Sequence, residues 1–149
     1  MTDNVIVIGS DHAGYSLKQV LVAHLEEKGW QVVDVGTDGA ESVDYPDFGA
    51  AVAHALKDGK APRGIAVCGT GIGISIAANR HDWIRAGLCH DITSARFCRQ
   101  HNDANVLALG ARLIGEEVAK DCVDVFLTTE FEGGRHQRRV DKLGFAESR

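Results

Sequence analysis

The chain has 149 residues, and its 44% hydrophobic and 25% charged fractions are typical of one compact globular domain that needs no disulfides. Its formal net charge of -5 argues against nucleic acid or an anionic membrane as the main partner. No stretch approaches the ~20 apolar residues that a membrane-spanning helix requires, so we expect no association with a membrane.

Strand-like and helix-like patterns alternate along the chain with short connections. Apolar and β-branched runs predict strands over residues 4–8, 31–35, 65–67, 84–88 and 105–109. Apolar residues at three- and four-residue spacing predict helices over residues 17–25, 47–57, 92–101 and 115–127, and a further helix after the glycine turn at 69–73. This alternation predicts the α/β class: a three-layer αβα sandwich with a Rossmann-like, five-stranded parallel sheet, in one domain over residues 1–149.

The tail over residues 130–149 departs from this alternation. It contains a glycine turn followed by a basic segment, in which Arg135 and Arg139 lie four residues apart and therefore on one helical face. We expect an extra C-terminal helix that packs on a neighbouring subunit, and a solvated charged helix is the alternative.

The cysteines indicate a reducing environment. Cys68, Cys89, Cys98 and Cys122 show no C-x-x-C spacing, which argues against a zinc site or a redox pair. The first apolar run is short and lacks a basic lead, unlike a secretory signal. We therefore expect a cytoplasmic protein with free thiols.

The stretch over residues 64–79 combines a buried strand, Cys68, a glycine turn and a helix start. The first N–H groups of a helix lack intrahelical partners and favour an anion, and a thiol beside them is readily converted to the thiolate. Gly73 is followed by Ile74 instead of Lys, so the stretch is not a phosphate-binding P-loop. We interpret it as a reactive thiol next to an oxyanion site, and a buried structural cysteine is the alternative.

Polar side chains collect where the predicted strands end, which is where open α/β sheets bind ligands. We expect the following residues at that edge: Asp11, His12, Asp44, Tyr45, Cys68 and the segment His101, Asn102 and Asp103. A thiolate base, backbone N–H groups that hold an enediolate and a histidine acid would suit an aldose–ketose isomerase without a metal. Arg135 and Arg139 would hold a substrate phosphate.

Two other chemistries fit some of these residues. The histidines and aspartates suggest a metal, but none shows the short spacing of an H-E-x-x-H site, so we expect no metal. Cys68 and His101 would also suit a nucleophilic pair for acyl or thiol chemistry, which the spacing leaves open.

Five sequence blocks carry a resemblance to a known family: GSDHAGY at 9–15, DYP at 44–46, CGTGIGISIAAN at 68–79, RQHNDANVLALGAR at 99–112 and EGGRHQRRV at 132–140. In this order they resemble ribose-5-phosphate isomerase type B, within the wider group that includes galactose-6-phosphate isomerase subunits. The resemblance implies an enzyme of carbohydrate metabolism, in the pentose phosphate pathway, that interconverts D-ribose 5-phosphate and D-ribulose 5-phosphate through an enediolate. It also implies a homodimer or homotetramer with active sites between subunits, and no cofactor or metal.

The resemblance assigns roles to individual residues. Cys68 matches the base, His101 the acid that opens the furanose ring, and Thr70 an assisting residue. The matching substrate-binding residues are Asp11, His12, Tyr45, Gly69, Gly71, Ile72, Gly73, Asn102, Arg112, Arg135 and Arg139. The alternatives are a hexose-6-phosphate isomerase acting on allose or galactose 6-phosphate, and a non-catalytic sugar-phosphate sensor.

Overall fold

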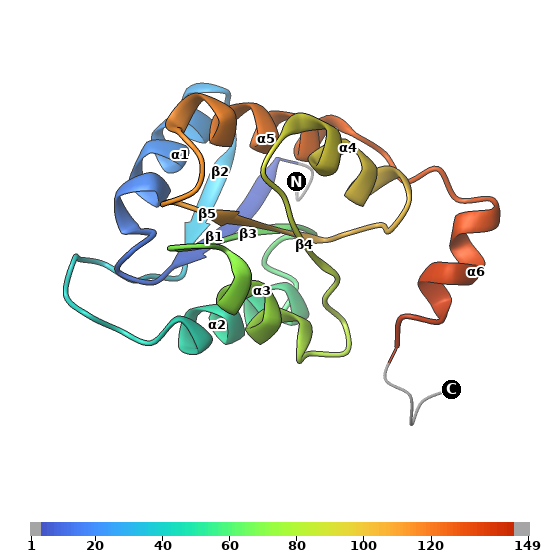
Figure 1. Ribbon diagram of the computed structural model, residues 1–149, viewed down its shortest axis with the longest axis horizontal. Coiled ribbons are helices and arrows are strands. Elements are labelled where there is room, and N and C mark those ends of the chain that lie inside the picture. Colours follow the sequence, from blue (N-terminus) through green and yellow to red (C-terminus); the bar gives the residue numbers. More distant parts are fainter. Residues whose placement is uncertain (1–3, 145–149) are drawn as a thin grey trace.

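A computed structural model describes residues 4–144, and five parallel strands form its single sheet. The strands are β1 (Val5–Ser10), β2 (Gln31–Asp34), β3 (Gly64–Cys68), β4 (Ala86–Leu88) and β5 (Val106–Gly110), in the order β2-β1-β3-β5-β4. Helices α1 (Tyr15–Glu27), α4 (Ile92–Gln100) and α5 (Glu116–Thr128) cover one face, and α2 (Tyr45–Lys57) and α3 (Ile72–Asn79) cover the other (Figure 1). The predicted αβα sandwich with a five-stranded parallel sheet is confirmed.

The element boundaries differ little from the predicted ones. β3 runs through Cys68, and β4 begins at Ala86 instead of residue 84 because the side chain of Asn105 accepts the N–H of Arg85 at 2.7 Å. The predicted C-terminal helix is α6 (Arg135–Asp141), and residues 145–149 of the predicted tail lie outside the described part of the chain, as do residues 1–3. Over residues 4–144 no helix is long and apolar enough to cross a membrane.

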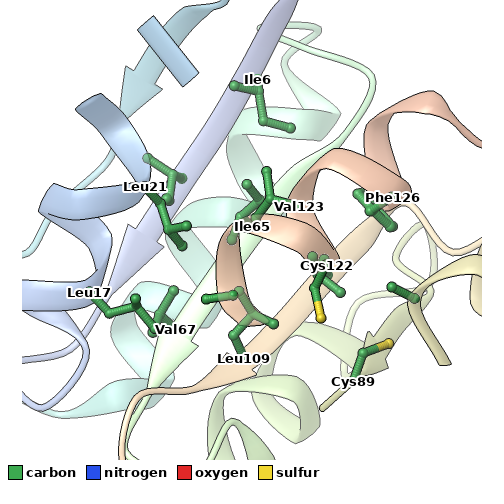
Figure 2. Close-up of a cluster of buried hydrophobic side chains, with 14 of the residues drawn as sticks. Ile6, Leu17, Leu21, Ile65, Val67, Cys89, Leu109, Cys122, Val123 and Phe126 are labelled. Carbon is green, nitrogen blue, oxygen red and sulfur yellow. The ribbon is translucent and has the colours of Figure 1, made fainter. Parts of the chain in front are cut away.

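The alternation of side chains along the strands builds a separate core on each face of the sheet. Ile6 and Ile8 of β1 point to the α1/α5 side, where Figure 2 shows Leu21 of α1 and Phe126 of α5 in one cluster with Leu109 of β5. The α2/α3 core contains residues of alternate register: Val7, Val52, Ala66, Cys68, Ile74 and Ala108. The thiol of Cys68 is therefore part of the packed interior on the α2/α3 side.

The strand order reverses between β1 and β3. From β1 the chain first moves outward to β2 and then crosses to β3 on the other side of β1. Ser10, the last residue of β1, pairs with Val67, the next-to-last residue of β3. Ligands in open α/β sheets bind in the crevice at such a reversal, so the residues that follow β1 and β3 lie where a substrate is expected.

Candidate active site

The loop between β3 and α3 holds the sulfur of Cys68 with a backbone group. Cys68 is 4% exposed, and the N–H of Gly71 donates to its Sγ at 3.2 Å. Gly71 adopts a left-handed conformation (φ 77°), which turns its N–H back toward the end of the strand. The loop thus places a backbone donor against the sulfur at the end of the strand.

The start of α3 supplies further donors beside this sulfur. Thr70 is exposed, and its Oγ1 accepts the N–H of Ile72 at 3.2 Å, so the hydroxyl lies at the helix start. The first N–H groups of any α-helix lack partners within the helix and attract negative charge. The first turn of α3 is therefore suited to hold an oxyanion formed next to Cys68.

The turn after β1 lies against the end of β3. Asp11 is buried; its N–H donates to the carbonyl of Val67 at 3.2 Å, and its carboxylate accepts the N–H of Gly14 at 3.0 Å. The Nδ1 of His12 lies 3.1 Å from the N of Val43 and 3.2 Å from its O, so the backbone fixes the imidazole. Main-chain contacts thus hold Asp11 against the residue that precedes Cys68 and fix His12 against Val43.

A buried lysine orders the loop that carries Val43. Lys18 is 1% exposed, and its Nζ donates at 2.6 Å to Oδ1 of Asp34 and at 2.6 Å to the carbonyl of Thr37. These two bonds attach the end of β2 and the loop that follows it to helix α1. Because Val43 of the same loop contacts the ring of His12, the bonds of Lys18 indirectly help to hold that ring in place.

Tyr45 and Arg112 flank the glycine loop. A methyl group added to Gly73 would lie 2.6 Å from the ring of Tyr45, so the ring packs directly on this glycine. The N–H of Arg112 donates to the carbonyl of Gly69 at 2.8 Å. Together with these two residues, the loop and the β1 turn form what we call the Cys68 cluster: Asp11, His12, Tyr45, Cys68, Gly69–Gly73 and Arg112.

A second group of predicted site residues lies around the end of α4. His101 follows α4, and its ring stacks on that of His136 with centroids 4.4 Å apart and planes 15° apart. The Nε2 of His136 lies 3.5 Å from a carboxylate oxygen of Glu132. A cavity of about 250 Å³ is lined by His101, Asn102, His136, Arg139, Val140 and Leu143. We call His101, Asn102, Arg135, His136 and Arg139 the His101 cluster.

His136 is a member of this cluster that the sequence did not single out. It is 5% exposed within an otherwise exposed basic helix. Burial lowers the pKa of His136 below its ordinary value, and the positive charge of Arg135 lowers it further. The one available signal in the sequence was its spacing of four residues from Glu132, and a glycine turn at 133–134 brings the two side chains together.

The expectation that His101, Asn102 and Asp103 lie at the carboxyl edge of the sheet is wrong. A helix between two parallel strands must run back, so α4 ends at the amino edge, just before β5 begins. The first residue of β5, Val106, pairs with Gly64, the first residue of β3, whereas Cys68 is the last. At ~3.3 Å per residue the two ends of β3 lie roughly 13 Å apart.

The predicted site residues are therefore divided between two places in one chain. The Cys68 cluster lies at the carboxyl edge, and the His101 cluster lies at the amino edge. The N–H of Glu132 donates to the carbonyl of Gln100 at 3.0 Å and attaches the start of the tail to the end of α4. In Figure 1, α6 lies at the right, beyond α4 and away from both the sheet and helix α3.

Comparisons with known proteins agree with this architecture. A family model described as Ribose/Galactose Isomerase matches residues 6–143. The chain is 50% identical to ribose-5-phosphate isomerase B of Escherichia coli (strain K12) over 144 residues, which is 97% of either chain. It is 48% identical to D-erythrulose-4-phosphate isomerase of Pectobacterium atrosepticum over 143 residues, 95% of this chain and 94% of the other. The solved structure of Clostridium thermocellum ribose-5-phosphate isomerase B superimposes with a TM-score of 0.94 at 55% identity, covering 97% of each chain.

Proposed function

The chain belongs to the ribose/galactose isomerase family, and from this membership and the geometry of the Cys68 cluster we propose that it interconverts D-ribose 5-phosphate and D-ribulose 5-phosphate. The observation that carries the proposal is the N–H of Gly71 directed at the sulfur of Cys68, at the point where the strand order reverses. A proton acceptor there, beside unpaired helix N–H groups, is what isomerisation through an enediolate requires.

In the proposed reaction, Cys68 acts as the base. Its thiolate removes the proton from C2 of the open-chain aldose, the C–H electron pair forms the C1–C2 double bond, and negative charge moves to O1. The N–H groups of the loop over residues 69–73 stabilise this oxygen. The thiol then returns the proton to C1 while a proton passes from O2 to O1, which yields the ketose.

Ring opening precedes this step, because ribose 5-phosphate is mostly a furanose. We assign it to His101, which protonates the ring oxygen, with Thr70 assisting at the loop. His101 and Cys68 lie at opposite edges of the same sheet, so the acid of each site would come from a partner subunit in a homodimer or homotetramer. The same arrangement would bring Arg135 and Arg139 of the partner, with Arg112, to the substrate phosphate.

Proton NMR of ribose 5-phosphate with the EDTA-treated protein in D2O tests this proposal. We expect ketose to appear with deuterium at carbon, and the Cys68→Ala variant to bind substrate without turnover. Near-normal turnover by that variant would remove Cys68 from its assigned role. An unchanged spectrum with four-, five- and six-carbon sugar phosphates would favour the sensor instead.

The shared site can be tested by mixing two inactive variants. A dimer of one Cys68→Ala chain and one His101→Asn chain contains one site in which both residues are altered and one in which both are intact. Random exchange of subunits in a mixture of equal amounts should therefore restore about a quarter of the wild-type turnover. If each site were built within one chain, the mixture would stay inactive.

A second candidate substrate is the tetrose pair D-erythrose 4-phosphate and D-erythrulose 4-phosphate. A relative named for this activity is 48% identical to the chain. A comparison of kcat/KM for four-, five- and six-carbon phosphates distinguishes the tetrose, pentose and hexose activities. The tetrose is also informative about mechanism: its O4 carries the phosphate, so it forms no furanose and needs no ring-opening acid.

A further inference from the structure

The imidazole of His101 is held in a stack of three rings. Its centroid lies 4.4 Å from that of His136, with planes 15° apart, and 4.7 Å from that of Phe97, with planes 23° apart. Two rings stacked this closely on one imidazole must occupy its opposite faces. Phe97 belongs to α4 and His136 to α6, so the stack joins two helices across the ring of His101.

The two stacked histidines and the nearby Glu132 have side chains of the kinds that bind metals, but their geometry suits stacking better. Donor atoms of His101, Glu132 and His136 all lie within 4.8 Å of one another. A metal ion needs lone pairs that converge on one point, whereas the nitrogens of two nearly parallel stacked rings point along parallel planes. Arg135 and Arg139 add positive charge nearby, which disfavours a cation.

We propose that His136 is a positioning residue for the ring-opening acid. This inference rests on the proposed function, in which His101 is that acid. His101 follows the last residue of α4 and is only partly buried, so its side chain would otherwise be free to rotate. The tail supplies the constraint: the ring of His136 stacks on that of His101, and Glu132, which precedes α6, is attached by its own N–H to the carbonyl of Gln100 at the end of α4.

A ring-opening acid is needed for only one of the two substrates. In ribulose 5-phosphate the phosphate blocks O5, so the ketose has no furanose form and is open-chain. Removal of its C1 proton by Cys68, followed by reprotonation, therefore requires no acid at a ring oxygen. A defect in the orientation of His101 should slow turnover of ribose 5-phosphate and leave exchange of the ketose C1 proton intact.

The experiment compares His136→Ala, which removes the stacked ring, with His136→Phe, which keeps a ring without nitrogens. We expect His136→Ala to lower kcat for ribose 5-phosphate about tenfold or more, while deuterium entry at C1 of ribulose 5-phosphate in D2O stays within about twofold of wild type. His136→Phe should recover most of the lost turnover. Gel filtration and circular dichroism of each variant establish assembly and folding.

Three outcomes would overturn the proposal: unchanged turnover by His136→Ala, an equal loss of turnover and exchange, or a His136→Phe variant as slow as His136→Ala. If His136→Ala fails to fold, Phe97→Leu removes the opposite face of the stack and should give the same selective loss. His101→Asn tests the role of His101 as the acid separately from the role of His136. If it does not slow ribose 5-phosphate, the proposed role of His101 fails, independently of His136.

Discussion

Replacing Gly71 with alanine tests how tightly the loop after Cys68 is packed against the sheet. Gly71 has φ 77°, a conformation that costs a non-glycine residue about 1–2 kcal/mol. A Cβ at this position would lie 2.5 Å from Cδ1 of Leu88, 2.9 Å from the carbonyl carbon of Leu109 and 3.1 Å from the N of Gly110. The end of Leu88 can rotate away, but the β5 backbone cannot, so the loop must move.

Gly59 provides a matched control. It has φ 78° and no atom within 4 Å of an added Cβ, so Gly59→Ala carries the conformational cost without the clash. Overpacking adds about 1–3 kcal/mol, and we expect Gly71→Ala to lower the free energy of unfolding by about 2–5 kcal/mol in total. Urea unfolding of both variants at one protein concentration measures the difference.

The outcome bears on the site as well as on stability. Because the N–H of Gly71 holds the sulfur of Cys68, Gly71→Ala should also lose turnover, whereas Gly59→Ala should retain it. If the two variants unfold within about 0.5 kcal/mol of each other, the loop tolerates the extra atom, and the close packing described above does not constrain it.

Three further perturbations follow from the contacts described above. Lys18→Met keeps the aliphatic stem but breaks the two hydrogen bonds of the buried ammonium group. Because Asp34 is partly exposed, water can solvate its carboxylate, and we expect the free energy of unfolding in urea to fall by about 2–3 kcal/mol. A change below ~0.5 kcal/mol would contradict the role of Lys18. Burial lowers the pKa of His81 and His136 below 6.5, so the unfolded chain binds more protons and stability should fall as pH drops through 6.5 toward the lowered values. Urea midpoints that are flat over that window would refute this, and replacing both histidines with glutamine should weaken the dependence. Gly73→Ala should displace the 42% exposed ring of Tyr45 and raise KM for ribose 5-phosphate, with a stability change of about 1 kcal/mol or less; an unchanged KM would show that Tyr45 does not contact substrate.

The sequence predicted the fold well because its strands have strong local patterns. The β-branched run that forms β1 is buried on both faces, and such runs occur almost only in parallel sheets covered by helices. The loop after Cys68 was also recognisable, since a run of small residues between a predicted strand and a predicted helix is typical of a tight turn. Both features are set by residues that are adjacent in the sequence, so they can be identified from the sequence alone.

The candidate site was only partly predictable, for a topological reason. Residues that end a strand or directly follow one, such as Cys68 and Asp11, were placed correctly at the carboxyl edge. His101 follows a helix, and that helix returns the chain to the opposite edge before β5 begins. The burial of His136 depends on the stack with His101, a contact between separate helices that no pattern within the basic tail reveals.

The two cores of the sheet should differ in how freely their residues can drift during evolution. On the α1/α5 side, an exchange such as Leu21 for another aliphatic residue changes packing on the face of the sheet opposite the sulfur, and selection acts mainly on stability. On the α2/α3 side, Cys68 is itself one of the packed residues, together with Ala66, Ile74 and Ala108. A volume change there shifts the sulfur that we propose as the base, so we expect turnover to constrain variation on that side before folding does.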